Sequence, residues 1–359
     1  MVSLAFDTVY LGASPTDTPE GAKGIYRFFF NCETGAISPV TLAVKVCNPS
    51  FLAHHPSGKF LYAVNESEEF LGQPGGGVSA FSVDLKSGAL ALLNRQPTGG
   101  DIPCHLAMDA TGRVLVAANY GSGSVSVFPI LPDGRVGIRS DLHQHTGSGP
   151  NASRQKGPHT HSVTFSPDNR FVLVNDLGID QIVVYRLDLE KARLVLNQPA
   201  HLAPGAGPRH FCFSPDGRQG YSINELDNTV TRLDWDAQNG ALTARESVST
   251  LPPDFKNYSK ASEIALHPNG NFLYASNRGY DSIAVYRRHP ATGHLSLIEH
   301  VPTGGSEPRS FGISPNGRWL IASNQYVNTL QLFRIDELTG KLTPQGEPIA
   351  APSPICVLF

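Results

Sequence analysis

The stretch HPNGNFLYASN at residues 267–277 is nearly repeated as HPSGKFLYAVN at residues 55–65. Its first four residues belong to a turn motif that occurs six times, as HPSG at 55–58, DATG at 109–112, SPDN at 166–169, SPDG at 214–217, HPNG at 267–270 and SPNG at 314–317. Each motif ends in Gly or Asn, the residues that tolerate the positive φ of tight turns. The motifs recur every 47 to 57 residues, so the sequence predicts a structural repeat.

Each repeat has the pattern of four short strands. A strand such as HSVTFS precedes the turn, and an apolar strand follows it and ends in a polar residue seven positions on: Asn65, Asn119, Asp176, Asn224, Asn277 and Asn324. Further strands such as SIAVY and GHLSLI complete the repeat. Four short strands in about 50 residues are typical of a β-propeller blade. We expect the six polar residues, which we call the asparagine ring, to be structural, because Asn side chains readily bond backbone groups.

The two ends of the chain predict one more blade. Residues 7–14, 24–30 and 41–46 match the second, third and fourth strands of a repeat, and residues 355–359 match the missing first strand. Pairing the ends closes the ring and leaves no open sheet edge. The sequence therefore predicts an all-β, seven-bladed β-propeller with four antiparallel strands per blade. It forms a single domain over residues 1–359, with about 51 residues per blade.

Composition excludes several other classes of protein. The chain has 35 glycines and 28 prolines, and 16% of its residues are charged, against roughly 25% in an average soluble protein. No apolar run is long enough for a membrane-spanning helix, and a net charge of −3 implies no strong field for nucleic acid. The five cysteines form no CxxC pair and the N-terminus lacks a signal-peptide pattern, so we expect a cytoplasmic protein. A ring closed by its own ends is expected to be a monomer.

Strand order predicts where the chemistry lies. The start of the first strand and the end of the second share one face of the ring, opposite the repeated turns. The loops on that face differ between blades, and variable loops on a rigid scaffold commonly carry function. The titratable residues at those positions are Glu66, His161, Arg209, Glu225, Arg278 and Arg309. We expect them to converge at the mouth of the channel, and such a concave cluster is the default candidate for an active site.

The pattern alone leaves catalysis and simple binding open, because many propellers are binding scaffolds. His159 and His161 have the spacing of a metal-binding pair, but nothing else at this face completes a ligand set. We therefore expect no metal and no other cofactor. The sequence also lacks a phosphate-binding P-loop and a GxSxG nucleophile motif.

Several long motifs carry a resemblance to a known family. They are HPSGKFLYAVNE, GPHTHSVTFSPDNRF, GPRHFCFSPDGR, NELDNTVT, LYASNRGYDSIAVYR and the terminal PICVLF. In order and spacing they resemble the seven-bladed propeller lactonases, the propeller type of 6-phosphogluconolactonase. The resemblance implies hydrolysis of 6-phospho-glucono-1,5-lactone in the pentose phosphate pathway. It also implies a catalytic quartet of His161, Arg209, Glu225 and Arg278.

We expect His161 to be the general base, and Arg209 and Arg278 to stabilise an oxyanion or hold the phosphate. Glu225 orients an arginine or shares the base role. The further candidates for substrate binding are Arg309, His105, Glu66, and Arg154 with Lys156 of the long loop at 142–158. Related fungal carboxymuconate cyclases are thought to use the same quartet. A cycloisomerase, a hydrolase of another sugar lactone and a non-catalytic scaffold are therefore the alternatives.

Overall fold

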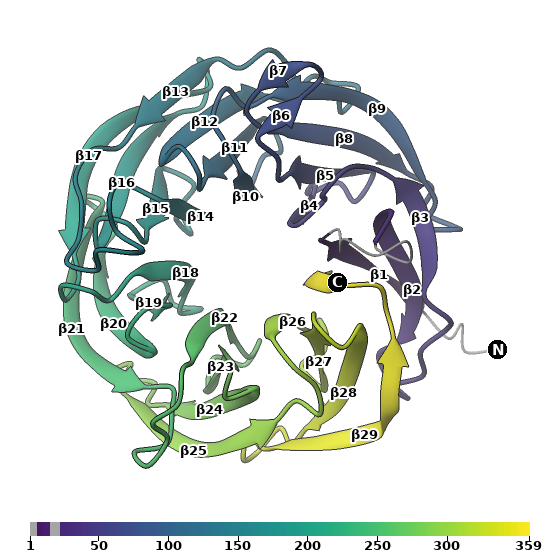
Figure 1. The fold of residues 1–359 in the computed structure, drawn as a ribbon, viewed down its shortest axis with the longest axis vertical. Helices are drawn as coiled ribbons and strands as arrows, with labels where there is room; N and C mark the ends of the chain where they lie inside the picture. The colour runs from purple at the N-terminus through teal and green to yellow at the C-terminus, as the bar shows by residue number, and fades with distance from the viewer. Residues whose placement is uncertain (1–5, 15–21) are drawn as a thin grey trace.

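The structure is a computed structural model that describes residues 6–14 and 22–359. These ranges contain strands and turns but no helix, and seven four-stranded antiparallel sheets surround a central channel (Figure 1). The predicted all-β, seven-bladed propeller is confirmed. The described residues accordingly include no helix that could cross a membrane. The expectation drawn from the first residues of the chain rests in part on residues 1–5, which lie outside the described ranges.

In every blade the four strands follow one another from the channel outward. The blade that joins the chain ends has, in that order, β30 (Pro354–Leu358), β1 (Phe6–Ala13), β2 (Gly24–Asn31) and β3 (Thr41–Lys45). The next three have β4 (Leu52–His54), β5 (Phe60–Asn65), β8 (Gly77–Val83) and β9 (Leu90–Pro97); β10 (Pro103–Met108), β11 (Val114–Asn119), β12 (Ser124–Pro129) and β13 (Asp141–Gln144); and β14 (Thr160–Phe165), β15 (Phe171–Asp176), β16 (Gln181–Asp188) and β17 (Arg193–His201). The last three have β18 (Pro208–Phe213), β19 (Gln219–Asn224), β20 (Thr229–Asp236) and β21 (Ala241–Ser249); β22 (Lys260–Leu266), β23 (Phe272–Arg278), β24 (Ser282–Arg288) and β25 (Leu295–Pro302); and β26 (Pro308–Ile313), β27 (Trp319–Asn324), β28 (Thr329–Ile335) and β29 (Leu342–Ala350). A small hairpin of β6 (Glu69–Phe70) and β7 (Gln73–Pro74) stands apart.

The six repeated turns have the expected backbone. The last residue of each turn has a positive φ, from 58° at Asn169 to 74° at Gly112. Its N–H donates to the carbonyl three residues before, as Gly270 does to His267 at 2.8 Å. His267 is buried, and its Nε2 bonds the carbonyl of Gly317 in the next blade at 2.7 Å. The turns therefore join neighbouring blades as well as neighbouring strands.

The asparagine ring is structural, as expected, and all six of its members are fully buried. Three of the side-chain amides donate to backbone carbonyls in the connections that lead from one blade to the next. Asn65 donates to Cys47 at 2.7 Å, Asn277 to Thr250 at 2.7 Å and Asn324 to Thr303 at 3.0 Å. Each bond links the end of a second strand to the connection between two blades. Without it, the carbonyl of that connection would be buried and unpaired.

Neighbouring blades share apolar clusters and a repeated tyrosine hydrogen bond. Four buried tyrosines of second strands donate to a glycine carbonyl in the next blade: Tyr10 to Gly88, Tyr62 to Gly134, Tyr221 to Gly293 and Tyr274 to Gly340, at 2.7 to 2.9 Å. Their hydroxyls add a directional bond to the packing, because a buried hydroxyl without a partner would be costly.

The ring is closed by the C-terminal strand. β30 pairs with β1 in antiparallel register, with Leu11 opposite Val357 and Gly12 opposite Cys356 (Figure 1). At Gly12 a Cβ atom would lie 2.6 Å from the carbonyl oxygen of Pro49 and 2.9 Å from the Cβ of Cys356. Only glycine allows the two strands to approach this closely.

Deletion of Pro354–Phe359 is expected to abolish cooperative folding. It removes the buried Ile355, Cys356 and Val357, and burial of one such apolar side chain is worth roughly 1.5–3 kcal/mol of a total stability of about 5–15 kcal/mol. Thermal unfolding followed by circular dichroism, with soluble yield, measures the effect. Leu338→Ala, at an 85% exposed position, is the control and should melt like the wild type. A truncated protein with unchanged melting would show that closure by β30 is dispensable.

Candidate active site

The residues predicted at the channel mouth meet around a cavity of about 300 Å³. Its lining is Glu66, Ile102, Cys104, Tyr120, Arg154, His161, Glu225, Lys260, Arg278 and Arg309. Arg209 lies next to this lining, where its Nε is 3.2 Å from Glu225. The structure thus brings together all six side chains that strand order placed at the mouth, although they come from five blades.

A bulge at the start of an inner strand presents three of these side chains, those of His161, Arg209 and Arg309. In β14, Thr160 and Ser162 pair with consecutive residues of β15, so His161 is an extra residue. Arg209 in β18 and Arg309 in β26 are extra residues in the same way. A β-bulge leaves its extra residue outside the ladder and re-aims its side chain, commonly next to active sites. Recurrent bulges at the mouth end of inner strands therefore aim these three side chains, whereas Glu66, Glu225 and Arg278 lie at or just after the ends of second strands.

Glu225 is the centre of a buried ionic network. One carboxylate oxygen accepts from Arg154 at 2.6 Å, and the other accepts from Arg278 at 2.6 Å and faces Arg209 at 3.2 Å. The side chains of Glu225, Arg209 and Arg278 are each 3–4% exposed. Removal of the carboxylate would leave buried like charges unpaired, which is strongly destabilising.

The network fixes the charge states of its members. Burial alone would raise the pKa of Glu225, but Arg278 and Arg209 hold it well below its usual value, so the carboxylate stays ionised. Burial, followed by the nearby charges of Arg278 and Arg309, lowers the pKa of Arg209 to about 9. Its guanidinium is therefore still charged at neutral pH.

His161 forms one wall of the cavity as a buried, neutral imidazole. Burial, with Arg209 and His210 beside it, lowers the pKa of His161 well below its usual value. Its ring makes an edge contact with Tyr120, at 5.5 Å between centroids. The thiol of Cys104 donates to the His161 carbonyl oxygen at 3.3 Å. An imidazole that is unprotonated at pH 7 and borders a cavity can accept a proton from a bound water.

Cations outnumber carboxylates at the mouth. Among the described residues, the cations are Arg154, Arg209, Lys260, Arg278 and Arg309, and the carboxylates are Glu66, Glu225 and Glu307. Lys260 pairs with Glu307 at 3.2 Å. No described residue pairs with the guanidinium of Arg309. The cavity therefore has an excess of positive charge in a protein whose net charge is −3, and it suits an anionic ligand.

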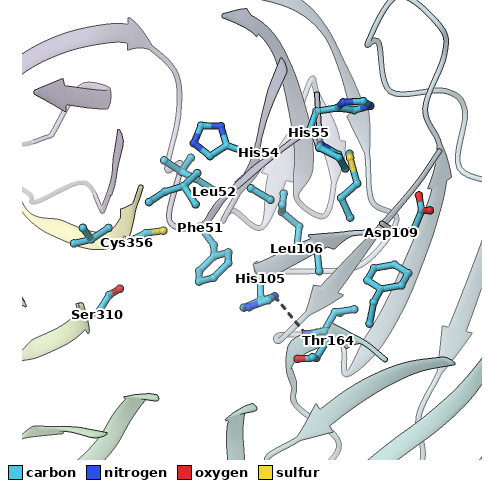
Figure 2. Close-up of a pocket in the computed structure, with 18 of the residues that line it drawn as sticks. Phe51, Leu52, His54, His55, His105, Leu106, Asp109, Thr164, Ser310 and Cys356 are labelled. Carbon is cyan, nitrogen blue, oxygen red and sulfur yellow. Dashed lines mark hydrogen bonds between the residues drawn. The ribbon is translucent and has the colours of Figure 1, made fainter. Parts of the chain in front are cut away.

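Two of the candidate substrate-binding residues lie elsewhere. Lys156 is exposed and outside the cavity lining, whereas Arg154 of the same loop reaches Glu225. The loop is also shorter than expected, because residues 142–144 belong to β13. His105 lines a second cavity of about 800 Å³, which extends toward the repeated turns. Figure 2 shows His105 there beside Phe51, with its Nδ1 accepting from the Val163 N–H at 3.3 Å. The side chain that follows a bulge therefore lies deeper in the channel than the side chain of the bulged residue.

The pair of His159 and His161 does not form a metal site with other side chains of the described ranges, where no group of three or more potential ligands occurs. The His159 ring stacks on Tyr120 at 4.5 Å, and its Nδ1 bonds the Tyr120 carbonyl oxygen at 2.9 Å. The His159 side chain therefore packs against Tyr120, a residue of the cavity lining.

Comparison with known proteins agrees with this geometry. Residues 8–359 match the family model described as lactonase, 7-bladed β-propeller. The chain belongs to this lactonase family. It is therefore a lactonase, a hydrolase that opens cyclic esters. The family was implied by the motifs, and the match over nearly the whole chain confirms it.

Individual relatives are similar over most of the lactonase. A 6-phosphogluconolactonase of Bacillus subtilis is 38% identical over 353 residues, which cover 98% of this chain and 99% of the relative. A 6-phosphogluconolactonase of Formosa agariphila is 37% identical, with 83% and 84% covered. The solved structure of a periplasmic gluconolactonase of Pseudomonas aeruginosa is 30% identical with a TM-score of 0.91, and 98% of each chain is covered.

Buried neutral histidines predict that the lactonase loses stability in mild acid. Burial is the largest cause that lowers the pKa values of His105, His161 and His210, so the unfolded chain binds protons at these sites that the folded chain does not. The contribution of these histidines to the free energy of unfolding is fully present above about pH 6.5. It falls as the pH drops, by up to about 1.4 kcal/mol per pH unit for each histidine. Urea unfolding at pH 7.5, 6.5 and 5.5 measures this slope. His161→Gln should make the slope shallower, and a free energy of unfolding that does not change with pH would contradict the neutral cluster.

Proposed function

We propose that the protein hydrolyses 6-phospho-glucono-1,5-lactone to 6-phosphogluconate, with the reaction at the channel mouth. The observation that carries the proposal is the cavity of about 300 Å³ in which a neutral imidazole borders a surplus of cations. A phosphorylated lactone is an anion that needs only an activated water and a stabilised oxyanion. The names of the two relatives at 37–38% identity support this substrate.

In the proposed reaction His161 accepts a proton from a water molecule as its oxygen bonds to the lactone carbonyl carbon. The carbonyl oxygen becomes an oxyanion that Arg278, which lines the cavity, stabilises, with Arg209 next to the lining beside Glu225. The bond from that carbon to the ring oxygen then breaks, and the ring oxygen receives the proton from His161. Glu225 keeps the two arginines in place, and its low pKa and three cationic neighbours leave it a poor base.

For the phosphate, the free guanidinium of Arg309 is the best partner, with Lys260 beside it in the same lining. Guanidinium groups bind phosphate oxygens through two parallel hydrogen bonds, which makes Arg309 suited to the role. Arg154 already donates to Glu225 and Tyr120, so fewer of its donors are available. Glu66 borders the cavity without a side-chain partner among the described residues and could accept from sugar hydroxyls.

We also propose that the enzyme acts in the pentose phosphate pathway as a cytoplasmic monomer, without a nucleic acid or membrane partner. Its five cysteines form no disulfide, which suits a reducing compartment. Light scattering of the purified protein tests the monomer, and fractionation of the source cells tests the compartment. A dimer in solution or a periplasmic location would contradict these assignments.

Loss of the imidazole should slow the chemical step. His161→Ala is expected to lower kcat by roughly 10²-fold or more, the usual scale for the loss of a general base. The assay follows disappearance of 6-phosphogluconolactone made in place by glucose-6-phosphate dehydrogenase, with spontaneous hydrolysis subtracted. Circular dichroism controls for folding. A folded variant with wild-type turnover would remove His161 from the mechanism.

Loss of the proposed phosphate contact should affect only phosphorylated substrates. Arg309→Met is expected to raise KM for 6-phosphogluconolactone by roughly 10- to 100-fold, the scale of a lost hydrogen bond between charged groups. KM and kcat for unphosphorylated gluconolactone should stay within about threefold of the wild type. Lys156→Met is measured in parallel. If that variant alone shows the selective effect, the phosphate lies over the 142–158 loop instead.

A further inference from the structure

Two side chains behind the cavity, His210 and Glu263, continue the ionic network away from the mouth. Nδ1 of His210 lies 2.8 Å from a carboxylate oxygen of Glu263, and Nε2 lies 3.2 Å from Nη1 of Arg209. The same Nη1 donates to the Ser262 carbonyl oxygen at 2.8 Å. Glu263, His210, Arg209 and Glu225 thus form one continuous chain of hydrogen bonds and ion pairs that ends at the cavity.

The chemistry of its neighbours fixes the tautomer of His210. A guanidinium can only donate hydrogen bonds, so Nε2 of His210 must be the unprotonated acceptor. An ionised carboxylate can only accept, so Nδ1 must carry the proton. Glu263 is held in the ionised form, because it also accepts from the N–H of Ile264 at 3.0 Å and from the hydroxyl of Ser310 at 3.4 Å. Only the neutral Nδ1–H imidazole satisfies both partners at once.

His210 also lies between the two cavities of the channel. Its ring makes edge contacts with His161 of the mouth cavity, at 5.3 Å between centroids, and with His105 of the deeper one, at 5.1 Å. Figure 2 shows His105 and Ser310 on the side of the deeper cavity, which Glu263 also lines. The groups that face His210 are therefore Arg209, His161, His105 and Glu263. A protonated His210 would face three basic groups and lose its bond to Arg209.

We propose that His210 and Glu263 are positioning residues of the lactonase site, with Glu263 fixing the Nδ1–H tautomer of His210 and His210 fixing the guanidinium of Arg209. Glu225 holds Arg209 from the mouth side, and His210 holds it from the channel side. Without His210 the guanidinium keeps its charge but gains freedom to turn about its remaining contacts. This inference rests on the proposed reaction at the mouth, where a preorganised Arg209 adds positive charge behind Arg278, with which it shares Glu225, as the oxyanion develops.

The test compares three variants with the wild type. His210→Phe keeps the ring but has no acceptor for Arg209, and kcat should fall by roughly 10- to 100-fold while KM stays within about threefold. His210→Gln offers an amide oxygen near the position of Nε2 and should recover most of the lost kcat. Glu263→Gln removes the charge that selects the tautomer and should lower kcat with little change in KM.

Nitrogen NMR of histidine-labelled protein gives a readout independent of activity. The wild type should show His210 as the Nδ1–H tautomer, assigned as the resonance missing in His210→Gln. In Glu263→Gln the Nε2–H form should become populated. The control is His267→Phe, which removes another buried histidine near the repeated turns and should lower stability without affecting kcat.

The outcomes separate this inference from the proposed substrate. A wild type inactive on 6-phosphogluconolactone refutes the proposed function, and kinetics of the same variants on the lactone that the enzyme does open then test the inference. A folded His210→Phe with wild-type kcat refutes the positioning role. An Nε2–H tautomer in the wild type also refutes it, whatever the substrate.

Discussion

The pairing of β30 with β1 is the constraint on which the site depends. Six blades fold from consecutive segments, but the seventh needs both ends of the chain, so the ring has a fixed circumference only when these ends pair. The channel mouth collects Glu66, His161, Glu225, Arg278 and Arg309 from five blades. A ring that opened at the seam would let the blades move apart, and contacts of 2.6 to 3.2 Å between blades would be lost. Closure of the fold and assembly of the cavity are therefore one event.

Within the ring, a single carboxylate makes the cationic mouth possible. Arg154, Arg209 and Arg278 repel one another, and their approach in a buried place is tolerated because Glu225 lies between them. The desolvation of such a cluster is costly, so it contributes little or nothing to stability. What it provides is a set of donors held in position before a ligand arrives. Because the cations still outnumber the carboxylates at the mouth, an anion that enters meets a favourable potential without displacing Glu225.

The sequence predicted the fold and the mouth because both follow from the repeat. Turn spacing indicated the number of blades, and strand order put His161, Arg209, Glu225 and Arg278 on one face. Sequence could not reveal the bulges, since an extra residue in a strand changes no periodicity that a short strand displays. In β22 the irregularity lies between Ala261 and Ile264, and Glu263 borders the deeper cavity together with His105 and Ser310, which hold the same position in their repeats.

The same limit explains why sequence alone does not locate the side chains of His105, Lys156 and Lys260. His105 follows the bulged residue and borders the deeper cavity, where it stacks on Phe51 at 3.9 Å. Lys156 and Arg154 are two residues apart in a loop without a period, so sequence cannot say which one turns inward. Lys260 begins β22, lines the mouth cavity and pairs with Glu307, and only the structure shows these contacts.

The low pKa of His161 determines where the proton that it takes from water goes next in the proposed reaction. Burial and the charge of Arg209 disfavour the imidazolium, so His161 is a weak base but a strong acid once it has accepted a proton. Phe51, His105, His210 and His161 contact one another in sequence across the channel, and the neighbours of His161 on that side are neutral or cationic. Glu263, a carboxylate on that side, is already hydrogen-bonded to His210, so the departing ring oxygen of the lactone is the acceptor at hand. An imidazole kept in this environment is suited to brief transfer of a proton within one turnover, which lactone opening requires.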